Sequence, residues 1–269
     1  MRNVIQVTLV LAMLATGAAI VLAAVVKVQI AAKRLACGNQ LHVLACTLET
    51  YHNSNSCYPA GTAQNTNLPP EERLSWLVTI WPYIEAGPGL RLNPSESWKS
   101  NANYPPYVEY FGKTHEPAHP VGYMRLFQCP SNPQLPEPDE GSVNHYIGLA
   151  GVGRDAASLP IGAPGIGFFG YDRVLKKSDI TDGLSNTIAV IETLRDPGPW
   201  TAGGSPTVRG LSDPSRTPYF GPDGQWHSNH EVTLALFADG SIRNQTEKID
   251  PSVLEALATI AGGEDMSPP

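Results

Sequence analysis

The first part of the chain contains an apolar run that is long enough to cross a membrane. Residues 4–26 carry no charged side chain, and only Gln6, Thr8 and Thr16 are mildly polar. As an α-helix, this run is about 34 Å long, which exceeds a hydrocarbon layer of ~30 Å. The alternative is a cleaved secretory signal, but the apolar core of such signals usually has only ~7–15 residues. We therefore expect residues 1–26 to be a transmembrane anchor that crosses the membrane once.

The charges that flank this run do not give a simple orientation. Arg2 lies on one side, whereas Lys27, Lys33 and Arg34 lie on the other. Positive residues favour the cytoplasmic side of a membrane, so this pattern alone favours a cytoplasmic C-terminal domain.

Composition indicates a folded, loop-rich domain after the anchor. The chain has 269 residues, 42% of them hydrophobic, with 25 glycines and 25 prolines. This apolar content is sufficient for a core, and the glycine and proline content favours turns and β-structure. The net charge is −7, and no basic block lies outside the N-terminal region, so we expect no nucleic-acid partner.

Four cysteines fit an oxidising compartment but not a metal site, because they contain no C-x-x-C spacing. In a helix, Cys37 and Cys46 would lie about 13.5 Å apart along the axis and on opposite faces, so they cannot pair. If Cys129 forms a disulfide, Cys37 or Cys57 is its expected partner. The alternative is four buried free thiols.

The residues that follow the anchor predict an α+β domain. Apolar residues recur at helical spacing over residues 27–53, so we expect one long helix whose second half packs on a β-rich head, residues 54–269. Within the head we expect a helix from Pro70 to Trp81 and a strand over residues 187–191. We interpret residues 195–224 as an exposed loop.

The last forty residues give the clearest local signals. Residues 231–237 predict a strand, and Asp239-Gly240 predicts a hairpin turn before a return strand that begins at Ile242. Asp250 and Pro251 then form an N-cap and first-turn pair that predicts a short helix.

Two motifs match sequence patterns of catalytic or cofactor sites, but the residues around them do not fit the structures that these sites require. His115-Glu116-Pro117-Ala118-His119 matches the H-E-x-x-H zinc motif, which requires both histidines on one helical face, but Pro117 lies inside that turn. Residues 165–170 spell G-x-G-x-x-G without the strand and helix that a dinucleotide site requires. We interpret them as a turn-rich connection between strands, and keep a zinc hydrolase as a remote alternative.

Three aspartates next to turns are candidate calcium ligands. Asp179, Asp182 and Asp239 offer the carboxylate oxygens that Ca²⁺ accepts in irregular loops. Turn formation alone explains Asp182-Gly183 and Asp239-Gly240, so we expect no cofactor and keep Ca²⁺ as the alternative. No serine-hydrolase elbow is present in the sequence.

Several blocks, in order along nearly the whole chain, resemble the bacterial family known as domain of unknown function 1559, which is sometimes labelled a solute-binding domain. The blocks are residues 35–41, 51–53, 74–76, 82–85, 129–131, 144–148, 179–187 and 237–241. The motif positions are Cys37, Asn39, Tyr51, His52, Cys129, Asp182, Gly183, Asn186, His230, Asp239 and Gly240.

The resemblance implies a hydrophobic N-terminal helix packed on a β-rich, loop-rich head, similar to type IV pilins and to the pseudopilins of type II secretion. It also implies a cytoplasmic N-terminus, an extracytoplasmic C-terminal domain and no enzymatic activity. Two features depart from the family pattern. Leu22 stands where a prepilin leader places glutamate after Gly17, and His230 lies one position later than the family's histidine before Asp-Gly.

We therefore expect a non-enzymatic, single-pass membrane protein of the cell envelope. Its helix would associate with copies of itself or with other pilin-like subunits through small residues, Gly17, Ala18 and Ala19. The alternative is an extracytoplasmic ligand-binding module that uses exposed aromatic residues against a carbohydrate or peptide. The candidate aromatic residues are Trp98, Tyr104, Tyr107 and Tyr110.

Overall fold

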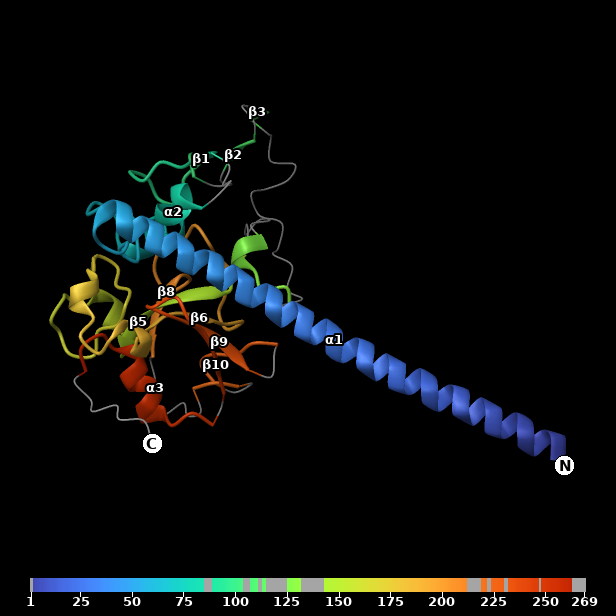
Figure 1. The fold of residues 1–269 in the computed structure, drawn as a ribbon. Coiled ribbons are helices and arrows are strands. Elements are labelled where there is room, and N and C mark those ends of the chain that lie inside the picture. The colour runs from blue at the N-terminus through green and yellow to red at the C-terminus, as the bar shows by residue number, and fades with distance from the viewer. Residues whose placement is uncertain are drawn as a thin grey trace.

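The computed structural model consists of a long helix that projects from a head built around one sheet (Figure 1). It describes residues 2–84, 89–103, 107–110, 113–114, 125–131, 143–211, 219–221, 224–229, 232–246 and 248–262. The helices are α1 (Arg2–Asn55), α2 (Trp76–Ile80) and α3 (Pro251–Ala258), and the short 3₁₀ helices are η1 (Pro70–Glu72), η2 (Trp81–Tyr83), η4 (Arg125–Phe127), η5 (Ala156–Ser158), η6 (Lys177–Asp179) and η7 (Leu184–Asn186).

Helix α1 is continuous over 54 residues, which confirms the single long helix predicted from the sequence. It contains no proline, so no backbone hydrogen bond is lost along its length. It ends two residues beyond the predicted residue 53, where Ser56 adopts a left-handed conformation with φ of 59° and its N–H donates to the His52 carbonyl at 2.7 Å. A residue in this conformation ends many helices by satisfying a terminal carbonyl.

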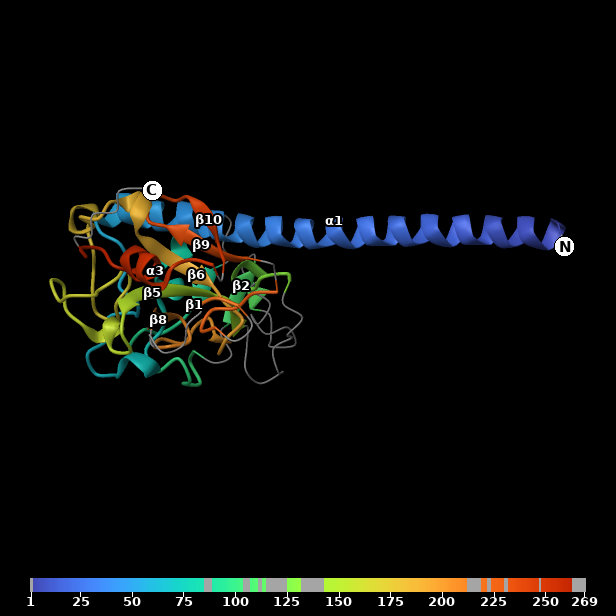
Figure 2. The ribbon, with the colours of Figure 1, turned by 90° about the horizontal axis from the view of Figure 1, so that it is seen from below.

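The two halves of α1 have different surroundings. The first half extends away from the head in both ribbon views (Figures 1 and 2). In the second half, the spacing of Cys37, Leu41, Leu44 and Leu48 places all four side chains on one face, and this face is buried against the head. The buried face therefore begins only after residue 36.

The main sheet has five strands in the order β10–β9–β6–β5–β8. Its strands are β5 (Tyr146–Val152), β6 (Ile188–Glu192), β8 (Val208–Leu211), β9 (Thr233–Phe237) and β10 (Ile242–Gln245). All neighbours pair antiparallel except β5 and β8, which run parallel. Two smaller sheets consist of β4 (Val143–Asn144) with β7 (Gly198–Pro199), and of β1 (Gly89–Arg91), β2 (Tyr107–Tyr110) and β3 (Lys113–Thr114).

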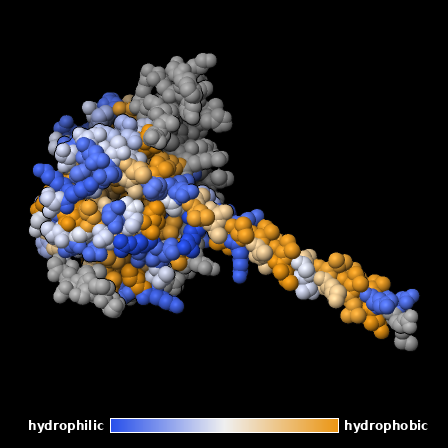
Figure 3. All heavy atoms as spheres, viewed as in Figure 1, coloured by the Kyte–Doolittle hydropathy of each residue, from blue (hydrophilic) through white to orange (hydrophobic). Residues whose placement is uncertain are grey.

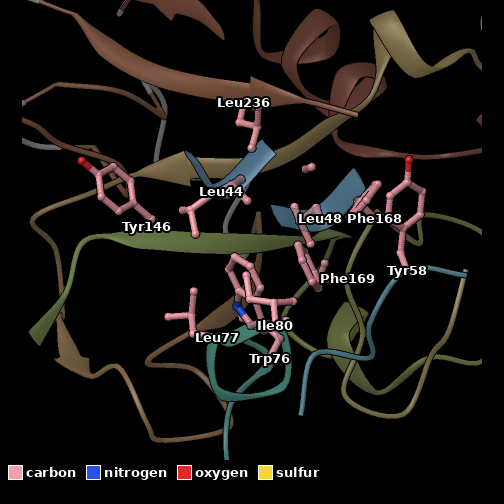
Figure 4. Packing of buried hydrophobic residues seen from close by; sticks show 14 of the residues in the cluster. Leu44, Leu48, Tyr58, Trp76, Leu77, Ile80, Tyr146, Phe168, Phe169 and Leu236 are labelled. Carbon is pink, nitrogen blue, oxygen red and sulfur yellow. The ribbon is translucent and has the colours of Figure 1, made fainter. Parts of the chain in front are cut away.

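The main sheet is buried on both faces. Along β9, Leu234 and Leu236 belong to the core cluster that includes the buried face of α1, whereas Ala235 and Phe237 belong to the cluster beneath α3. This alternation follows from the two-residue period of a strand. Figure 4 shows Leu44 and Leu48 of α1 close to this first cluster, which also contains Trp76 and Phe169. The head thus forms an α1–sheet–α3 arrangement.

The C-terminal signals of the sequence are confirmed. Strands β9 and β10 form a hairpin, and Gly240 in its turn has φ of 85°, a conformation that favours glycine. The Asp250 side chain accepts from the Ser252 N–H at 2.9 Å and caps α3, in which Pro251 occupies the first turn.

Two other sequence predictions are wrong. The helix expected from Pro70 to Trp81 is divided into η1 and α2, because the extended residues between them end at Ser75, whose hydroxyl caps α2. The exposed loop expected at residues 195–224 instead contributes β7, β8 and several buried side chains, Trp200, Leu211 and Tyr219 among them. Its glycines and prolines concealed these strands from the sequence pattern.

The glycine run of residues 165–170 is a connection between strands, as predicted. The Gly167 N–H donates to the Ala150 carbonyl at 2.6 Å, next to β5. A Cβ atom at Gly167 would lie 2.4 Å from the Gly151 nitrogen, so only glycine permits this approach of two backbones. The run therefore serves backbone packing, with no preceding strand and following helix to hold a pyrophosphate.

Arg173 organises the loops on this side of the head. Arg173 is buried, with a relative exposure of 4%. Its guanidinium donates to the carbonyl groups of Ala156, Leu159, Ala150, Gly167 and Phe169. Burial lowers the pKa of Arg173 to about 10, which still leaves the group charged at neutral pH. A single cation thus donates to carbonyl groups of strand β5 and of two connecting segments.

Replacing this cation should destabilise the fold strongly. We expect Arg173→Met to lower the free energy of unfolding by roughly 3–5 kcal/mol, because it removes five hydrogen bonds that a buried cation donates to carbonyl groups. Arg243→Met is the matched control, since the Arg243 side chain is 43% exposed and should change stability by less than about 1 kcal/mol. Urea unfolding of the full chain in detergent measures both. Equal stability of the two variants would contradict this role.

Candidate functional site at the helix–sheet junction

A disulfide joins α1 to the head at the point where the buried face of the helix begins. Cys37 and Cys129 are bonded, their Cα atoms lie 5.0 Å apart, and both side chains are buried. Of the two partners that the sequence left open for Cys129, Cys37 is correct, and the alternative of four free thiols is wrong. Cys46 and Cys57 are free. The bond closes a loop of 92 residues, and loops of this size give roughly 4 kcal/mol of stabilisation in chain-entropy treatments.

Residues of β5 and the segment before it surround the disulfide. The Tyr146 hydroxyl donates to Gln40 Oε1 at 2.6 Å, which links the sheet directly to α1. Burial, followed by the nearby Glu192 carboxylate, raises the pKa of Tyr146 well above its usual value. Tyr146 is therefore protonated at neutral pH and acts as a hydrogen-bond donor rather than as a base.

His145 supports the other half of the disulfide. Its ring Nδ1 accepts from the Cys129 N–H at 2.9 Å, and its backbone N–H donates to the Phe127 carbonyl at 2.8 Å. Burial lowers the pKa of His145 to about 4, so the ring is neutral at physiological pH. Because Nδ1 is an acceptor, the neutral ring carries its proton on Nε2.

Glu192 is the third group at this junction. Its carboxylate lies on β6, fully buried, and within 4.8 Å of both sulfur atoms. Two thiolates and a carboxylate are a plausible ligand set for a metal, but a disulfide holds no thiolate. In the oxidised protein, the two cysteines therefore join α1 to the head covalently and are not metal ligands.

The turn aspartates do not form the calcium site that the sequence allowed. Asp179 Oδ2 accepts from the Lys176 N–H at 2.7 Å, and Asp182 Oδ2 accepts from the Gly262 N–H at 2.7 Å. Asp239 Oδ1 accepts from the Ser241 N–H at 2.9 Å. Each carboxylate thus stabilises its own turn or chain crossing, and the three do not join into a common ligand cluster among the described residues.

Five of the family-motif positions nevertheless lie in one assembly of loops. Gly183 has φ of 95° and precedes η7, and Asn186 Nδ2 donates to the Asp182 carbonyl at 3.0 Å. The Asp239 N–H donates to the Leu184 carbonyl at 3.1 Å, which joins this loop to the turn that contains Gly240. These residues hold the β9–β10 turn against the segment that enters β6.

The remaining motif positions on α1 have different roles. Asn39 is exposed, and Tyr51 packs edge-on against Tyr83 with ring centroids 5.1 Å apart. His52 packs against Tyr58 with ring centroids 4.7 Å apart and an angle of 44° between the ring planes. His230, like the zinc-motif residues 115–119, lies outside the described residues.

Of the four aromatic residues proposed for ligand binding, the structure describes the side chain of Trp98 alone, and it is not fully exposed. Trp98 is half-buried, and its Nε1 donates to the Glu71 carbonyl at 2.9 Å, so it anchors a loop. Tyr104 and the side chains of Tyr107 and Tyr110 lie outside the described part of the chain.

One cysteine–histidine pair lies outside the junction. Cys46 Sγ is 3.8 Å from His42 Nε2, one turn apart on the exposed side of α1. A nucleophilic cysteine also needs donors that stabilise an oxyanion, and the N–H groups around this position are used within the helix. The backbone of α1 therefore offers this pair no oxyanion donor.

Comparison with known proteins identifies the family. A family model described as "Protein of unknown function (DUF1559)" matches residues 28–215, which is more than half of the chain. The chain belongs to this family. No curated protein and no solved structure matches it. The DUF1559 match begins just after the apolar run and includes both disulfide cysteines and Asp182, whereas Asp239 and Gly240 lie beyond its end.

Sequence reasoning missed Arg173, Glu192 and Tyr146 as organising residues of this DUF1559 head. Charged residues are rarely buried completely, so an isolated arginine or glutamate gives no signal of burial in a sequence. Tyr146 lies in the Asn-His-Tyr block of the family, and its position at the start of a buried strand was the available clue.

Neutral His145 gives the junction a measurable pH dependence. An unfolded histidine has a pKa of 6.5 and the folded one about 4, so the unfolded state binds more protons between these values. Stability therefore falls as the pH falls through this window, by about 2 kcal/mol between pH 7 and pH 5. Urea unfolding of the oxidised full chain at both pH values measures the loss.

His145→Asn should remove most of this loss, because the Asn side-chain oxygen still accepts from the Cys129 N–H but does not titrate. His42→Asn, at an exposed position of α1, should retain it. A wild-type stability that is unchanged between pH 7 and pH 5 would show that His145 is not buried in its neutral form.

Proposed function

We propose that this DUF1559 protein is a non-enzymatic, single-pass protein of the bacterial cell envelope. Residues 1–26 anchor it in a membrane, and the head lies on the extracytoplasmic side. The arrangement resembles that of type IV pilin and pseudopilin subunits, in which a helix serves as both membrane anchor and part of the head.

The observation that carries this proposal is the exposed apolar surface of α1. The helix is long and apolar enough to cross a membrane, and its most apolar stretch has no residue buried in the head. Leu14, Ile20 and Leu22 are each 65% exposed. Figure 3 shows mainly apolar surface along this projecting part of the helix. Such a surface is unfavourable in water and favourable in lipid.

The disulfide supports the extracytoplasmic orientation. Structural disulfides persist in oxidising compartments and are rare in the cytosol. Lys27, Lys33 and Arg34 favour the opposite orientation by charge, but a charge excess is a bias that a folded, disulfide-bonded head outweighs. The N-terminus is then on the cytoplasmic side.

The topology can be measured with the free thiol of Cys46, which is exposed on α1. We expect a membrane-impermeant maleimide to label Cys46 when it is applied from the extracytoplasmic side of intact cells. The test uses a Cys57→Ser background, in which Cys46→Ser is the matched control and should lose the label. We also expect the full chain to resist alkaline extraction from membranes, whereas deletion of residues 2–26 should release it. Labelling only after lysis, or full release of the intact chain by alkali, would contradict the proposal.

We further propose that the anchor associates with other copies through its small residues. A Cβ atom at Gly17 would meet nothing within 4 Å, so the fold of one chain does not require glycine at this position. Glycine in a helix costs about 1 kcal/mol relative to alanine, and close helix–helix approach in a membrane offsets such a cost.

Cross-linking in membranes tests this association. With Cys46 and Cys57 replaced by serine, we expect Ala18→Cys to form cross-linked dimers and Ile20→Cys, about 160° away around the helix, to form several-fold fewer. Adding Gly17→Ile should reduce the Ala18→Cys dimer several-fold by separating the helices. Equal dimer yields at both positions would show random collision and contradict the association.

A further inference from the structure

A groove of about 610 Å³ lies between α1 and the β9–β10 turn. Ala45, Leu48 and Glu49 line its α1 side, and Leu236 and Ala238 line the side formed by β9 and the turn. This volume is within the range of small-molecule pockets, ~300–1,000 Å³. The groove is separate from the disulfide junction and from the projecting half of α1.

The deepest side chains of the groove are aromatic and apolar. Tyr58 and Phe168 both line it, each is 2% exposed, and their ring centroids lie 4.6 Å apart. Leu48 and Leu236 are also almost completely buried. Figure 4 shows Tyr58 beside Phe168 and Leu48, with its hydroxyl oxygen at the edge of the apolar cluster. The base of the groove thus favours an apolar occupant.

The Tyr58 hydroxyl is the exception in this apolar base. Its oxygen is buried and has no hydrogen-bond partner among the described residues. A buried hydroxyl without a partner costs about 1–3 kcal/mol, so proteins rarely retain one without a role. Burial, followed by the Glu49 charge, raises the pKa of Tyr58 to about 12. The phenol therefore keeps its proton and offers a donor close to the Glu49 side of the groove.

The charged groups around the groove compensate one another. Lys177 Nζ lies 2.7 Å from Glu49 Oε1, and both residues line the groove, while Asp239 Oδ2 lies 3.7 Å from Arg243. No lining charge is left to select an ion, so the lining favours a neutral occupant. A peptide is disfavoured, because each of its residues would bring an N–H and a carbonyl that need partners, and the base offers one donor.

We propose that this groove binds a neutral, largely apolar small molecule through one acceptor oxygen, a ketone or ester carbonyl, which accepts from the Tyr58 hydroxyl. Phe168, Leu48 and Leu236 pack against the apolar body of the ligand. Glu49 and Lys177 line the groove as an ion pair and leave no net charge there. The assignment does not depend on the membrane anchor or on self-association.

Benzophenone is a suitable probe, because it is neutral, apolar, carries a single ketone oxygen and inserts into nearby C–H bonds on irradiation. We expect irradiation of the full chain in detergent to give saturable adducts on the groove peptides, residues 42–50 and 232–240. Adducts on residues 4–26, which contact the detergent, report how much probe partitions into the micelle and provide an internal reference.

Three variants make the experiment specific. Tyr58→Phe keeps the ring and its packing, and should weaken groove labelling roughly three- to tenfold, the effect of one net hydrogen bond. Ala45→Trp should fill the groove and abolish the labelling there. Ser158→Trp, at an exposed position of η5, is the matched control and should leave it unchanged. Circular dichroism and thermal unfolding establish that each variant is folded.

Diphenylmethane has the same two rings but no acceptor oxygen. In the wild type it should compete poorly with benzophenone, because the Tyr58 hydroxyl can donate only to the ketone oxygen. In Tyr58→Phe the two compounds should bind about equally well, because this donor is absent. Absence of saturable groove adducts, or labelling that survives Ala45→Trp, would overturn the site. Equal labelling of wild type and Tyr58→Phe would overturn the role of the tyrosine in selecting an acceptor.

Discussion

The structure depends on one face of α1 that is buried by the sheet. Cys37, Leu41 and Leu44 have no exposed surface, although residues on the first half of the same helix are largely exposed. The helix is uninterrupted, so its exposed apolar half is joined directly to the half that is buried against the head. The disulfide and the Tyr146–Gln40 hydrogen bond lie where the exposed half of the helix meets the head, so they hold α1 on the sheet at this point.

The parts of the fold that follow a regular period were predictable from the sequence. The spacing of Leu41, Leu44 and Leu48 gave the buried face of α1, and Asp239-Gly240 gave the hairpin, because helices and turns depend on nearby residues. The segment around Trp200 and Tyr219 was misread as an exposed loop. Its burial is decided by the parallel pairing of β8 with β5, residues that are far apart in the chain.

In the candidate sites too, features set by nearby residues were predictable, and features set by residues far apart in the chain were not. Helix spacing excluded a bond between Cys37 and Cys46 and left Cys37 or Cys57 as the partner of Cys129, but the choice of Cys37 required the fold that brings α1 to Cys129. The Asp239 carboxylate stabilises its own turn, as its sequence context indicated, whereas the Asp182 carboxylate accepts from the N–H of Gly262, a contact between distant residues that the sequence did not indicate. Tyr58 carried no signal, because a tyrosine before a proline gives no indication that its hydroxyl will be buried beside Glu49.

The position of the groove along α1 constrains how an occupant reaches it. If lipid ends near residue 26, the groove begins about 24 Å further along the helix at His42, well beyond the headgroup layer. An apolar ligand must then cross water to enter, which favours a small molecule over a long lipid chain. Because α1 itself forms one wall, the occupant contacts the helix and the head together. Binding therefore stabilises the seated position of the helix, and by linkage a shift of the helix on the sheet weakens binding to the same degree.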